Sequence, residues 1–353
     1  MTGLMLFSAA PAMADEGGRT LVVWPGVGTI SAAVAAASPG DTLQLEEGTF
    51  YDSVEITKTL TIRGEGSATV IKPPPKPPVN DCNSPGSVEG LCASGQLDSQ
   101  GNPVASKPVV DVRISDLRTT GFSDSGVIGF NTRGLRVTDV RSDHNGGYGI
   151  ARFFSTGSLF ADNWTSFNSE AGLYVGDSPQ AKSVVVDNHT EHNGIGVFLR
   201  DSTDVVAERN VSTGNCAGIL GLNTGQGATG PSGAGHYLIK DNDVARNDSA
   251  CAASDTGKPL SGIGIALAGV QGNRVIGNDV DHNAPTGPSV ASGGIIIVSP
   301  MGKLTNDNLV KDNDLRGNRP ADIVWDQLGS GNRVTDNACA TAMPANLGWC
   351  VRK

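Results

Sequence analysis

The stretch that decides the fold is "SVVVDNHTEHNGIGVFLRDS", residues 183–202. It contains an apolar run, an Asp-Asn turn, an Asn-Gly turn and a second apolar run. Apolar runs with period-two alternation, bounded by Asn and Gly, are typical of short strands joined by turns. The same pieces recur in the same order along the chain, so this stretch is one unit of a repeat.

The repeat is marked by pairs of asparagines that enclose four residues. These segments are "NWTSFN" (163–168), "NHTEHN" (188–193), "NVSTGN" (210–215), "NDVARN" (242–247), "NDVDHN" (278–283) and "NDLRGN" (313–318), and "VRSDHN" (140–145) fits with Val in the first Asn position. The closing asparagines, from 145 to 318, are separated by 23, 25, 22, 32, 36 and 35 residues. A unit this small cannot bury its own apolar face, so a period of this length predicts stacked units, a solenoid. Because each unit holds two or three short strands, the sequence predicts an all-β parallel β-helix.

The recurring Asn has a structural explanation in such a fold. Stacked turns of a β-helix lie ~4.8 Å apart, so equivalent residues form columns along the axis. An Asn amide can hydrogen-bond the same Asn one turn above and below, and Asn tolerates the left-handed conformation that bends a chain. We therefore expect ladders of asparagines, with the Asn residues themselves at the left-handed turn positions.

The N-terminal part belongs to the same body. "GTISAAVAAASPGD" (28–41) has the apolar spacing of a short helix, with Thr29 as N-cap and Pro39-Gly40 as the stop signal. We expect this helix to cap the open end of the solenoid. The Pro-rich segment 72–108 is expected to be a loop excursion outside the repeats, because its prolines lack the N–H that a strand ladder needs.

Composition and the chain ends narrow the class of function. The formal charge is −10, from 26 Lys and Arg against 36 Asp and Glu, without a basic cluster, which argues against nucleic acid as a partner. After residue 14, no stretch of the sequence has the ~20 apolar residues of a membrane span. Residues 1–14, "MTGLMLFSAAPAMA", are read as the remainder of a signal peptide, so we expect a secreted monomer with one domain over 15–353. The six cysteines favour the local pairs Cys82–Cys92, Cys216–Cys251 and Cys339–Cys350, although other pairings are open.

The pattern "GTISAAVAAASPGDTLQLEEGTF" (28–50), "TLTIRGEG" (59–66) and the Asn-Gly repeats resembles the right-handed parallel β-helix proteins of the pectin-lyase-like superfamily. The resemblance covers about residues 28–340. Within the superfamily, the chain is similar to the secreted actinobacterial branch and, more distantly, to a periplasmic accessory protein of a copper enzyme. It implies the fold, and a superfamily that includes polysaccharide lyases, glycoside hydrolases, uronate epimerases and proteins without a known reaction. The polygalacturonase motifs are absent, since the nearest strings are "NTR" (131–133), "GHY" (235–237) and "LIK" (238–240). The Arg-x-Pro-x-x-Arg signature of pectate lyases is missing too.

Alignment of the repeats on the Gly that opens the second strand predicts a candidate site. It places Tyr174 and Phe198 in one outward column and Arg200 in the next, beside Asp177 and Asp201. Exposed aromatic rings suit sugars, and two carboxyls one turn apart approach the ~5 Å separation of a retaining glycosidase. The predicted catalytic residues are therefore Asp177, Asp201, Arg200 and Tyr174. The alternative is that both aspartates form Asx turns, with Arg200 pairing locally.

Tyr148, Arg152 and Phe198 are the predicted substrate-binding residues. In a lyase or epimerase, Arg200 would neutralise a uronate carboxylate while Tyr174 or His144 transfers the proton. The aligned partners of Arg152 point inward, so Arg152 is either a buried, paired arginine or the sign of a local bulge.

A metal or cofactor is not predicted. His144, His192 and His282 share the position before the closing Asn, but skipped repeats separate them, so we expect solvated turn histidines. Ca²⁺ among outward carboxylates is the one metal left open, without a D-x-D-x-D run to support it. Three functions stay open: an enzyme acting on an extended polysaccharide, a noncatalytic solenoid that binds glycan or another envelope component, and an accessory protein of metalloenzyme maturation.

Overall fold

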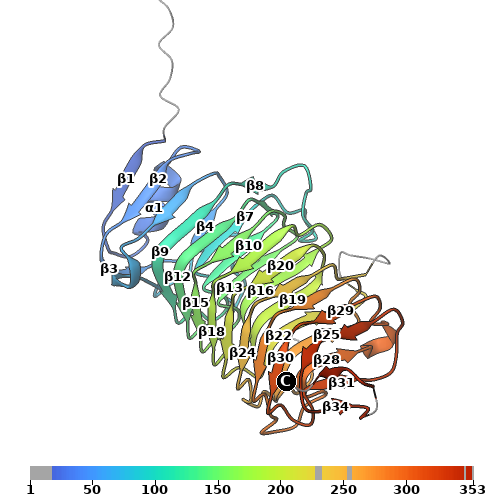
Figure 1. The fold of residues 1–353 in the computed structure, drawn as a ribbon. Coiled ribbons are helices and arrows are strands. Elements are labelled where there is room, and N and C mark those ends of the chain that lie inside the picture. Colours follow the sequence, from blue (N-terminus) through green and yellow to red (C-terminus); the bar gives the residue numbers. More distant parts are fainter. Residues whose placement is uncertain (1–17, 227–232, 253–256, 346, 352–353) are drawn as a thin grey trace, which may run out of the picture.

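The structure is a computed structural model that describes residues 18–226, 233–252, 257–345 and 347–351. The chain winds into a right-handed parallel β-helix, and each turn, or rung, contributes strands to three faces (Figure 1). Successive strands of one face pair in parallel, one rung after the next. The predicted solenoid is confirmed.

Faces 1 and 2 belong to one continuous sheet, bent at a corner, and face 3 is a separate sheet. Face 1 consists of β1 (Thr20–Val23), β2 (Thr42–Leu45), β5 (Thr61–Arg63), the first halves of β9 (Arg113–Thr120) and β12 (Arg136–Asp143), β14 (Leu159–Ala161), β17 (Ser183–Val186), β20 (Val205–Glu208), β23 (Leu238–Lys240), β26 (Arg274–Ile276), β29 (Leu309–Lys311) and β32 (Arg333–Thr335). Face 2 consists of β3 (Gly48–Tyr51), β6 (Thr69–Lys72), the second halves of β9 and β12, β15 (Trp164–Ser166), β18 (His189–Glu191), β21 (Val211–Thr213), β24 (Asp243–Ala245), β27 (Asp279–Asp281), β30 (Asp314–Arg316), β33 (Asn337–Ala338) and β35 (Cys350–Val351).

Face 3 consists of β4 (Val54–Ile56), β7 (Leu91–Ser94), β10 (Val127–Phe130), β13 (Ile150–Phe153), β16 (Ala171–Ser178), β19 (Ile195–Ser202), β22 (Ala217–Leu222), β25 (Ile263–Ala268), β28 (Gly293–Val298), β31 (Ile323–Trp325) and β34 (Ala342–Met343). The short strands β8 (Val109–Val110) and β11 (Thr132–Arg133) pair separately, and 3₁₀ turns of the described residues lie at Gly66–Ala68 and Pro300–Gly302.

The core fills the bore of the helix. Alternate residues of all three faces point inward, and side chains such as Val137, Leu173, Val185 and Val197 have no more than 1% of their surface exposed. Each such residue contributes ~1.5 to 3 kcal/mol when fully buried. Period-two alternation therefore places one set of side chains in the bore and leaves the other set to form the outer surface.

The asparagine ladders are confirmed. The Nδ2 atom of Asn168 donates to Oδ1 of Asn193 at 2.8 Å, and Asn193 donates in the same way to Asn215 at 3.2 Å. One ladder runs through Asn145, Asn168, Asn193, Asn215, Asn247, Asn283 and Asn318, and a second through Asn163, Asn188, Asn210, Asn242, Asn278, Asn313 and Asn337. The ladders mark the corners between faces 2 and 3 and between faces 1 and 2.

The prediction that the ladder asparagines adopt the left-handed conformation is wrong. The residue before each Asn has the positive φ, as in Asp187 (57°) and His192 (54°). The ladder requires its amides inside the corner, where they are buried. The residue that reverses the chain instead points its side chain outward, so Asp, His, Arg and Gly occur there.

The helix α1 (Thr29–Ala36) covers the N-terminal end of the bore with its buried Ile30 and Val34 (Figure 1). Its N-cap is Gly28, with a φ of 70°, so Thr29 is the first helical residue and not the predicted cap. Among the described residues, no helix is long and apolar enough to cross a membrane. The predicted signal peptide and the first residues of the predicted domain lie outside the described residues.

All three predicted disulfides form, Cys82–Cys92, Cys216–Cys251 and Cys339–Cys350. The segment 72–108, however, is not one continuous excursion. Residues 91–94 form β7, which pairs with β4 and β10 as a regular strand of face 3. The prolines lie on either side of this strand, so they do not interrupt its hydrogen bonds.

Candidate functional site

The outer surface of face 3 carries a second apolar cluster, separate from the bore. The predicted alignment is confirmed: Tyr174 pairs with Ala151 and Phe198, and Arg200 pairs with Gly176 and Leu222. The predicted exposure is wrong, because the side chains of Tyr174 and Phe198 are fully buried.

The rings of this cluster are buried because they pack on one another. Ring centroids of Tyr174 lie 4.6 Å from Tyr148, 4.7 Å from Phe153 and 5.4 Å from Phe198. Tyr148 retains 7% of its surface exposed. These aromatic residues thus form a small second core, and do not offer sugars an open stacking platform.

Asp177 and Asp201 occupy equivalent positions on adjacent rungs, both with a left-handed backbone. Asp201 is fully buried. Its carboxylate accepts two hydrogen bonds from Thr224, one from the backbone N–H at 2.8 Å and one from the side-chain hydroxyl at 2.6 Å. The Arg200 Nε lies 3.5 Å from the same carboxylate. These contacts support the turn interpretation for Asp201. Asp177 is half-buried, 3.4 Å from the Tyr174 hydroxyl. The catalytic roles of these four residues stay a prediction.

Arg152 is a buried arginine in a regular strand, because β13 continues its pairing with Gly129 on one side and Val175 on the other. Its guanidinium donates to the carbonyl of Ser155 and to the hydroxyl of Ser178. Burial lowers its pKa to about 9, with a small opposing contribution from Tyr174. Arg152 therefore faces the interior, away from the outer surface of face 3.

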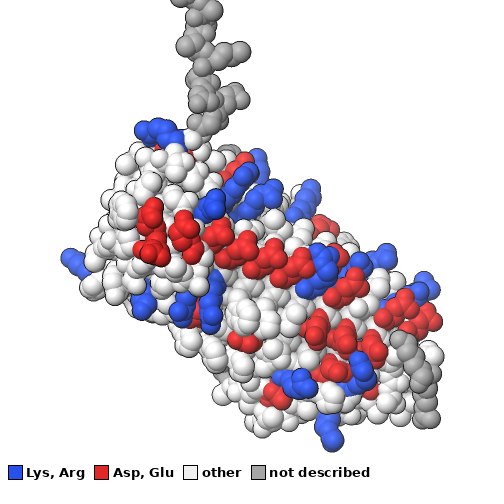
Figure 2. Space-filling view, turned by 60° about the vertical axis from the view of Figure 1, so that its left-hand side comes forward, with Lys and Arg blue, Asp and Glu red and all other residues white. Residues whose placement is uncertain are grey.

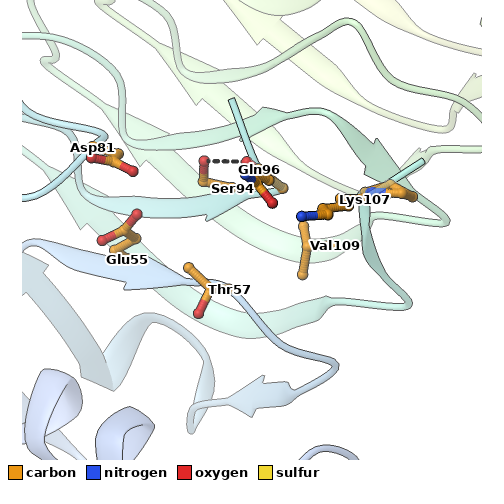
Figure 3. Close-up of a pocket in the computed structure, with 9 residues that line it drawn as sticks. Glu55, Thr57, Asp81, Ser94, Gln96, Lys107 and Val109 are labelled. Carbon is orange, nitrogen blue, oxygen red and sulfur yellow. Dashed lines mark hydrogen bonds between the residues drawn. The ribbon is translucent and has the colours of Figure 1, made fainter. Parts of the chain in front are cut away.

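A cleft that the sequence did not predict lies at the N-terminal end of face 3, with a volume of about 430 Å³ (Figure 3). We call it the carboxylate cleft, and its polar side chains are Glu55, Thr57, Asp81, Ser94, Gln96 and Lys107. Glu55 points outward from β4, and Figure 3 shows its carboxyl group on the same side of the cleft as that of Asp81.

A disulfide bond brings the two carboxyls of this cleft together. Glu55 pairs with Cys92 on the neighbouring strand β7, and Cys92 is bonded to Cys82. Asp81 is the residue before Cys82, so the bond holds it next to Glu55. The sequence signal that could have predicted this cleft was Asp81 next to the disulfide cysteine Cys82. It lies in the segment 72–108, whose proline-rich composition predicts a loop.

The cleft changes the acidity of Glu55. Partial burial raises the pKa of Glu55, the negative charge of Asp81 raises it further, and an interaction with the Asp81 backbone N–H partly offsets both effects. A carboxyl that holds its proton to a higher pH, next to a second carboxyl, is suited to donate a proton. The site can therefore carry general acid catalysis.

Comparison with protein families agrees with this architecture. The family model described as "Right handed beta helix region" matches residues 97–230 and 125–300, which together cover more than half of the chain. The chain belongs to the right-handed β-helix family. No curated protein sequence matches it significantly.

Solved structures resemble this right-handed β-helix protein over most of its length. The Azotobacter vinelandii mannuronan C-5 epimerase AlgE6 A-module has 15% identity and a TM-score of 0.56, with 88% of this chain and 87% of that chain covered. An alginate lyase from Paenibacillus sp. has 14% identity and a TM-score of 0.50, with 88% and 99% covered. DFA-IIIase from Arthrobacter chlorophenolicus A6 has 12% identity and a TM-score of 0.55, with 90% and 91% covered. At these identities the likeness shows the fold.

Two further clefts lie along face 3 of the β-helix protein. One, of about 390 Å³, is lined by Asp177 together with Asn131, Arg133, Phe154 and Gln180. Pro108 lines both this cleft and the carboxylate cleft, so the two are neighbours. The other, of about 450 Å³, is mainly apolar and contains Leu220, Leu222, Ile263, Val298 and Met301. Face 3 thus offers a series of clefts to an extended ligand.

The predicted turn histidines lie on the outside of the β-helix. The side chains of His144 and His282 are 61% and 59% exposed. Within the described ranges, no group of three or more His, Cys, Asp or Glu side chains is arranged to hold a metal ion.

Proposed function

We propose that this right-handed β-helix protein acts on a polysaccharide along face 3, and that the carboxylate cleft hydrolyses a glycosidic bond. The observation that carries the proposal is the pairing of Glu55, whose pKa is raised, with Asp81 in an open cleft. Glycoside hydrolases need two carboxyl groups with different protonation states on either side of the scissile bond. The names of the structural neighbours, a mannuronan epimerase and an alginate lyase, support a carbohydrate ligand.

Each carboxyl has a distinct role in this proposal. Glu55, protonated to a higher pH, donates its proton to the oxygen of the leaving sugar. Asp81 stabilises the positive charge that develops on the other sugar, either as the nucleophile or by activating water. Gln96 and Lys107 supply hydrogen-bond donors that orient the sugar hydroxyls.

Lys107 favours one second candidate reaction, elimination or epimerisation at a uronate sugar. A cation next to the uronate carboxylate stabilises the carbanion formed when a base removes the adjacent proton. In that case the carboxylate cleft acts by proton abstraction. Elimination then breaks the bond between C4 and the bridging oxygen, which leaves an unsaturated uronate on one product and a new reducing end on the other. Epimerisation returns the proton to the opposite face of the same carbon and breaks no glycosidic bond.

The test is incubation of the purified protein with a panel of neutral and acidic polysaccharides. Reducing-end assays detect chain cleavage, ultraviolet absorbance of an unsaturated uronate separates elimination from hydrolysis, and proton NMR detects epimerisation. We expect turnover of at least one glycan, and a loss of about 10²- to 10⁴-fold in Glu55→Gln. The matched control is Asp162→Asn, an exposed carboxylate on another corner with a φ of 56°, which Asn tolerates. Full activity of Glu55→Gln would contradict the proposal, as would binding of a glycan without any turnover.

The same assay tests the residues predicted from the sequence. Asp177→Asn and Arg200→Gln change the neighbouring cleft and the local ion pair. If they abolish turnover while Glu55→Gln is active, the catalytic residues are those of the predicted set. We expect these two variants to affect affinity for longer glycans more than turnover.

The proposal includes export from the cytoplasm. Three disulfides form in the structure, and structural disulfides persist in oxidising compartments. Fractionation of the producing cells tests this, and we expect the oxidised protein in the medium or the periplasm. Recovery in the cytoplasm with reduced cysteines would contradict it.

A further inference from the structure

We propose that face 2 carries a separate binding surface for an acidic polysaccharide. The surface, which we call the aromatic–arginine patch, consists of Arg118, Arg141, Trp164, Phe167 and His189. These residues lie on β9, β12, β15 and β18 and on the adjoining corner, away from the clefts of face 3.

The first half of the patch is one column of outward side chains. Arg118, Arg141, Trp164 and His189 occupy equivalent positions on four successive rungs. The Arg141 guanidinium carbon lies 5.9 Å from the Trp164 ring centre, and the Trp164 and His189 rings stack at 4.2 Å. The Trp164 Nε1–H donates to Glu191 at 3.2 Å, which fixes the indole on the surface. A large ring is therefore held in place while 42% of it stays exposed.

A second stack runs beside the first along the corner between faces 2 and 3. Phe167 lies between His144, at 4.9 Å, and His192, at 5.0 Å, with its ring nearly parallel to both. Phe167 is 49% exposed. Exposed apolar groups that gather on one surface and are rimmed by polar residues are typical of interaction sites.

One end of the patch presents two arginines on the surface of an acidic protein. The single, fully buried carboxylate of Asp143 is contacted by Arg118 at 2.7 Å, by Arg141 at 3.1 Å and by His144 at 2.9 Å. Two permanent cations thus share one buried anion at this end of the patch. Glu191, 3.3 Å from His189, is the second carboxylate of the patch, so with neutral histidines the positive and negative charges balance and the exposed positive charge lies at the arginine end. The whole chain has a formal charge of −10, so a patch with balanced charges and an arginine end differs from the acidic average.

Exposed aromatic rings beside arginines fit a ligand with an apolar face and a carboxylate. A uronate sugar has both, because its C–H groups pack on a ring and its carboxylate pairs with a guanidinium. A nucleic acid fits less well, since polyphosphate binding needs a long positive stripe.

Acidic residues surround the patch and keep it short. The same columns of face 2 continue into Asp243, Asp279 and Asp281. Asp116, Asp139, Asp162 and Asp187 follow one another at the next corner, and Figure 2 shows acidic side chains in a line along the molecule.

The inference does not depend on the chemistry of Glu55, because the patch and the carboxylate cleft lie on different faces. It extends the proposed function by giving the protein a second contact with an acidic glycan. The two sites are therefore separable by mutation.

The test measures the number of binding sites and the affinity by isothermal titration calorimetry, using oligosaccharides of alginate and of polygalacturonate. The full chain carrying Glu55→Gln is used, so that the ligand is not consumed, and cello-oligosaccharides serve as the neutral comparison. We expect Trp164→Ala and Arg141→Gln each to remove one site or to weaken it at least tenfold, and Trp164→Phe to retain most of the affinity. The matched controls are Trp24→Ala, whose ring is 68% exposed near the N-terminus, and Arg113→Gln, an exposed arginine on face 1.

Thermal melting of each variant separates binding from folding, because a ring stack with a purely structural role would lower the melting temperature and leave the number of sites unchanged. That outcome overturns the inference, as does equal affinity for the neutral oligosaccharides. Tighter binding of a single-stranded oligonucleotide, lost in Trp164→Ala, also overturns it. Normal activity of Glu55→Gln would contradict the proposed function and leave the count of sites at the patch unaffected.

Discussion

At the scale of single residues, the outer surface of face 3 shows how one alternating pattern produces different chemistry. Glu55 and Tyr174 belong to the same outward column of face 3, through the pairings of Cys92, Ile128 and Ala151. Tyr174 is buried among other rings, whereas Glu55 lies in an open cleft beside Asp81. The direction of a side chain follows from the period of the strand, but its exposure depends on what packs above it.

Removal of the Asp81 charge should lower the pKa of Glu55. Burial is the larger cause of the raised pKa and remains in Asp81→Asn, so we expect a partial return toward the usual value of 4.5. The proton on Glu55 is then lost at lower pH. NMR titration of the Glu55 carboxyl measures this directly, with Asp98→Asn in the same segment as the control. An unchanged titration of Glu55 would show that Asp81 does not act on it.

Glu89 predicts a pH dependence of stability. It is 4% exposed, accepts a hydrogen bond from the Ser125 N–H at 2.8 Å, and has its pKa raised from 4.5 to about 8 by burial and by the charge of Asp124. The folded state keeps this proton where the unfolded chain releases it. Its stabilising contribution is therefore complete below about pH 4.5 and is lost as the pH rises through about 8.

Glu89→Gln removes this loss, because the amide does not ionise. At pH 9 we expect the variant to exceed the original protein in free energy of unfolding by a few kcal/mol, about 3 to 5. Urea unfolding at pH 5 and pH 9 measures the difference, with the exposed Glu47→Gln as control. Parallel pH profiles of the two proteins would contradict the assignment.

At the scale of elements, the corner ladders connect rungs that are distant in sequence. Asn193 accepts hydrogen bonds from the backbone and side chain of Asn168, at 3.1 and 2.8 Å, and donates to the Thr165 carbonyl and to Asn215. The sequence predicts these ladders because equivalent residues must stack. It does not predict which residue bends the chain, since Asn and its predecessor are both polar and both tolerate a turn.

Asn193→Ala leaves the backbone and side-chain N–H donors of Asn168 without their acceptor, and it removes one donor from the Thr165 carbonyl and from the Asn215 side-chain oxygen. Each lost hydrogen bond in a buried site costs about 1 to 1.5 kcal/mol, so we expect a loss of about 2 to 4 kcal/mol. A third, shorter ladder runs from Asn273 through Asn308 to Asn332. Asn332→Ala, at its half-buried end, is the matched control and should cost less. Denaturant unfolding measures both. Equal losses in the two variants would mean that continuity of the ladder adds nothing.

The Cys82–Cys92 disulfide should matter more for the site than for the fold. Its loop spans 10 residues and that of Cys339–Cys350 spans 11, so both bonds are expected to contribute about 3 kcal/mol by the same loop-closure entropy. The bond at Cys82 also holds Asp81 beside Glu55. Replacement of Cys82 and Cys92 by Ser should therefore reduce turnover at least tenfold more than replacement of Cys339 and Cys350. The comparison uses melting temperatures and turnover of the two double variants, and equal turnover would contradict it.

At the scale of the whole molecule, the fold is more predictable than the site because it depends on residues that repeat. The Asn pairs, the Gly-opened strands and the spacing of the cysteines predict a parallel β-helix with local disulfides, and the structure confirms them. The carboxylate cleft depends on single residues outside the repeat. Asp81 lies beside Glu55 because Cys82 is bonded to Cys92, and Cys92 belongs to β7, the strand that pairs with Glu55. The sequence does not predict β7, because the segment around it is rich in proline.

The most direct test of the account is a crystal structure of Glu55→Gln in complex with an oligosaccharide that the original protein cleaves. The account predicts a glycosidic oxygen within hydrogen-bond distance of the residue 55 side chain, with the Asp81 carboxylate next to the same sugar bond. A sugar chain bound across Asp177 and Arg200, with the carboxylate cleft empty, would contradict it.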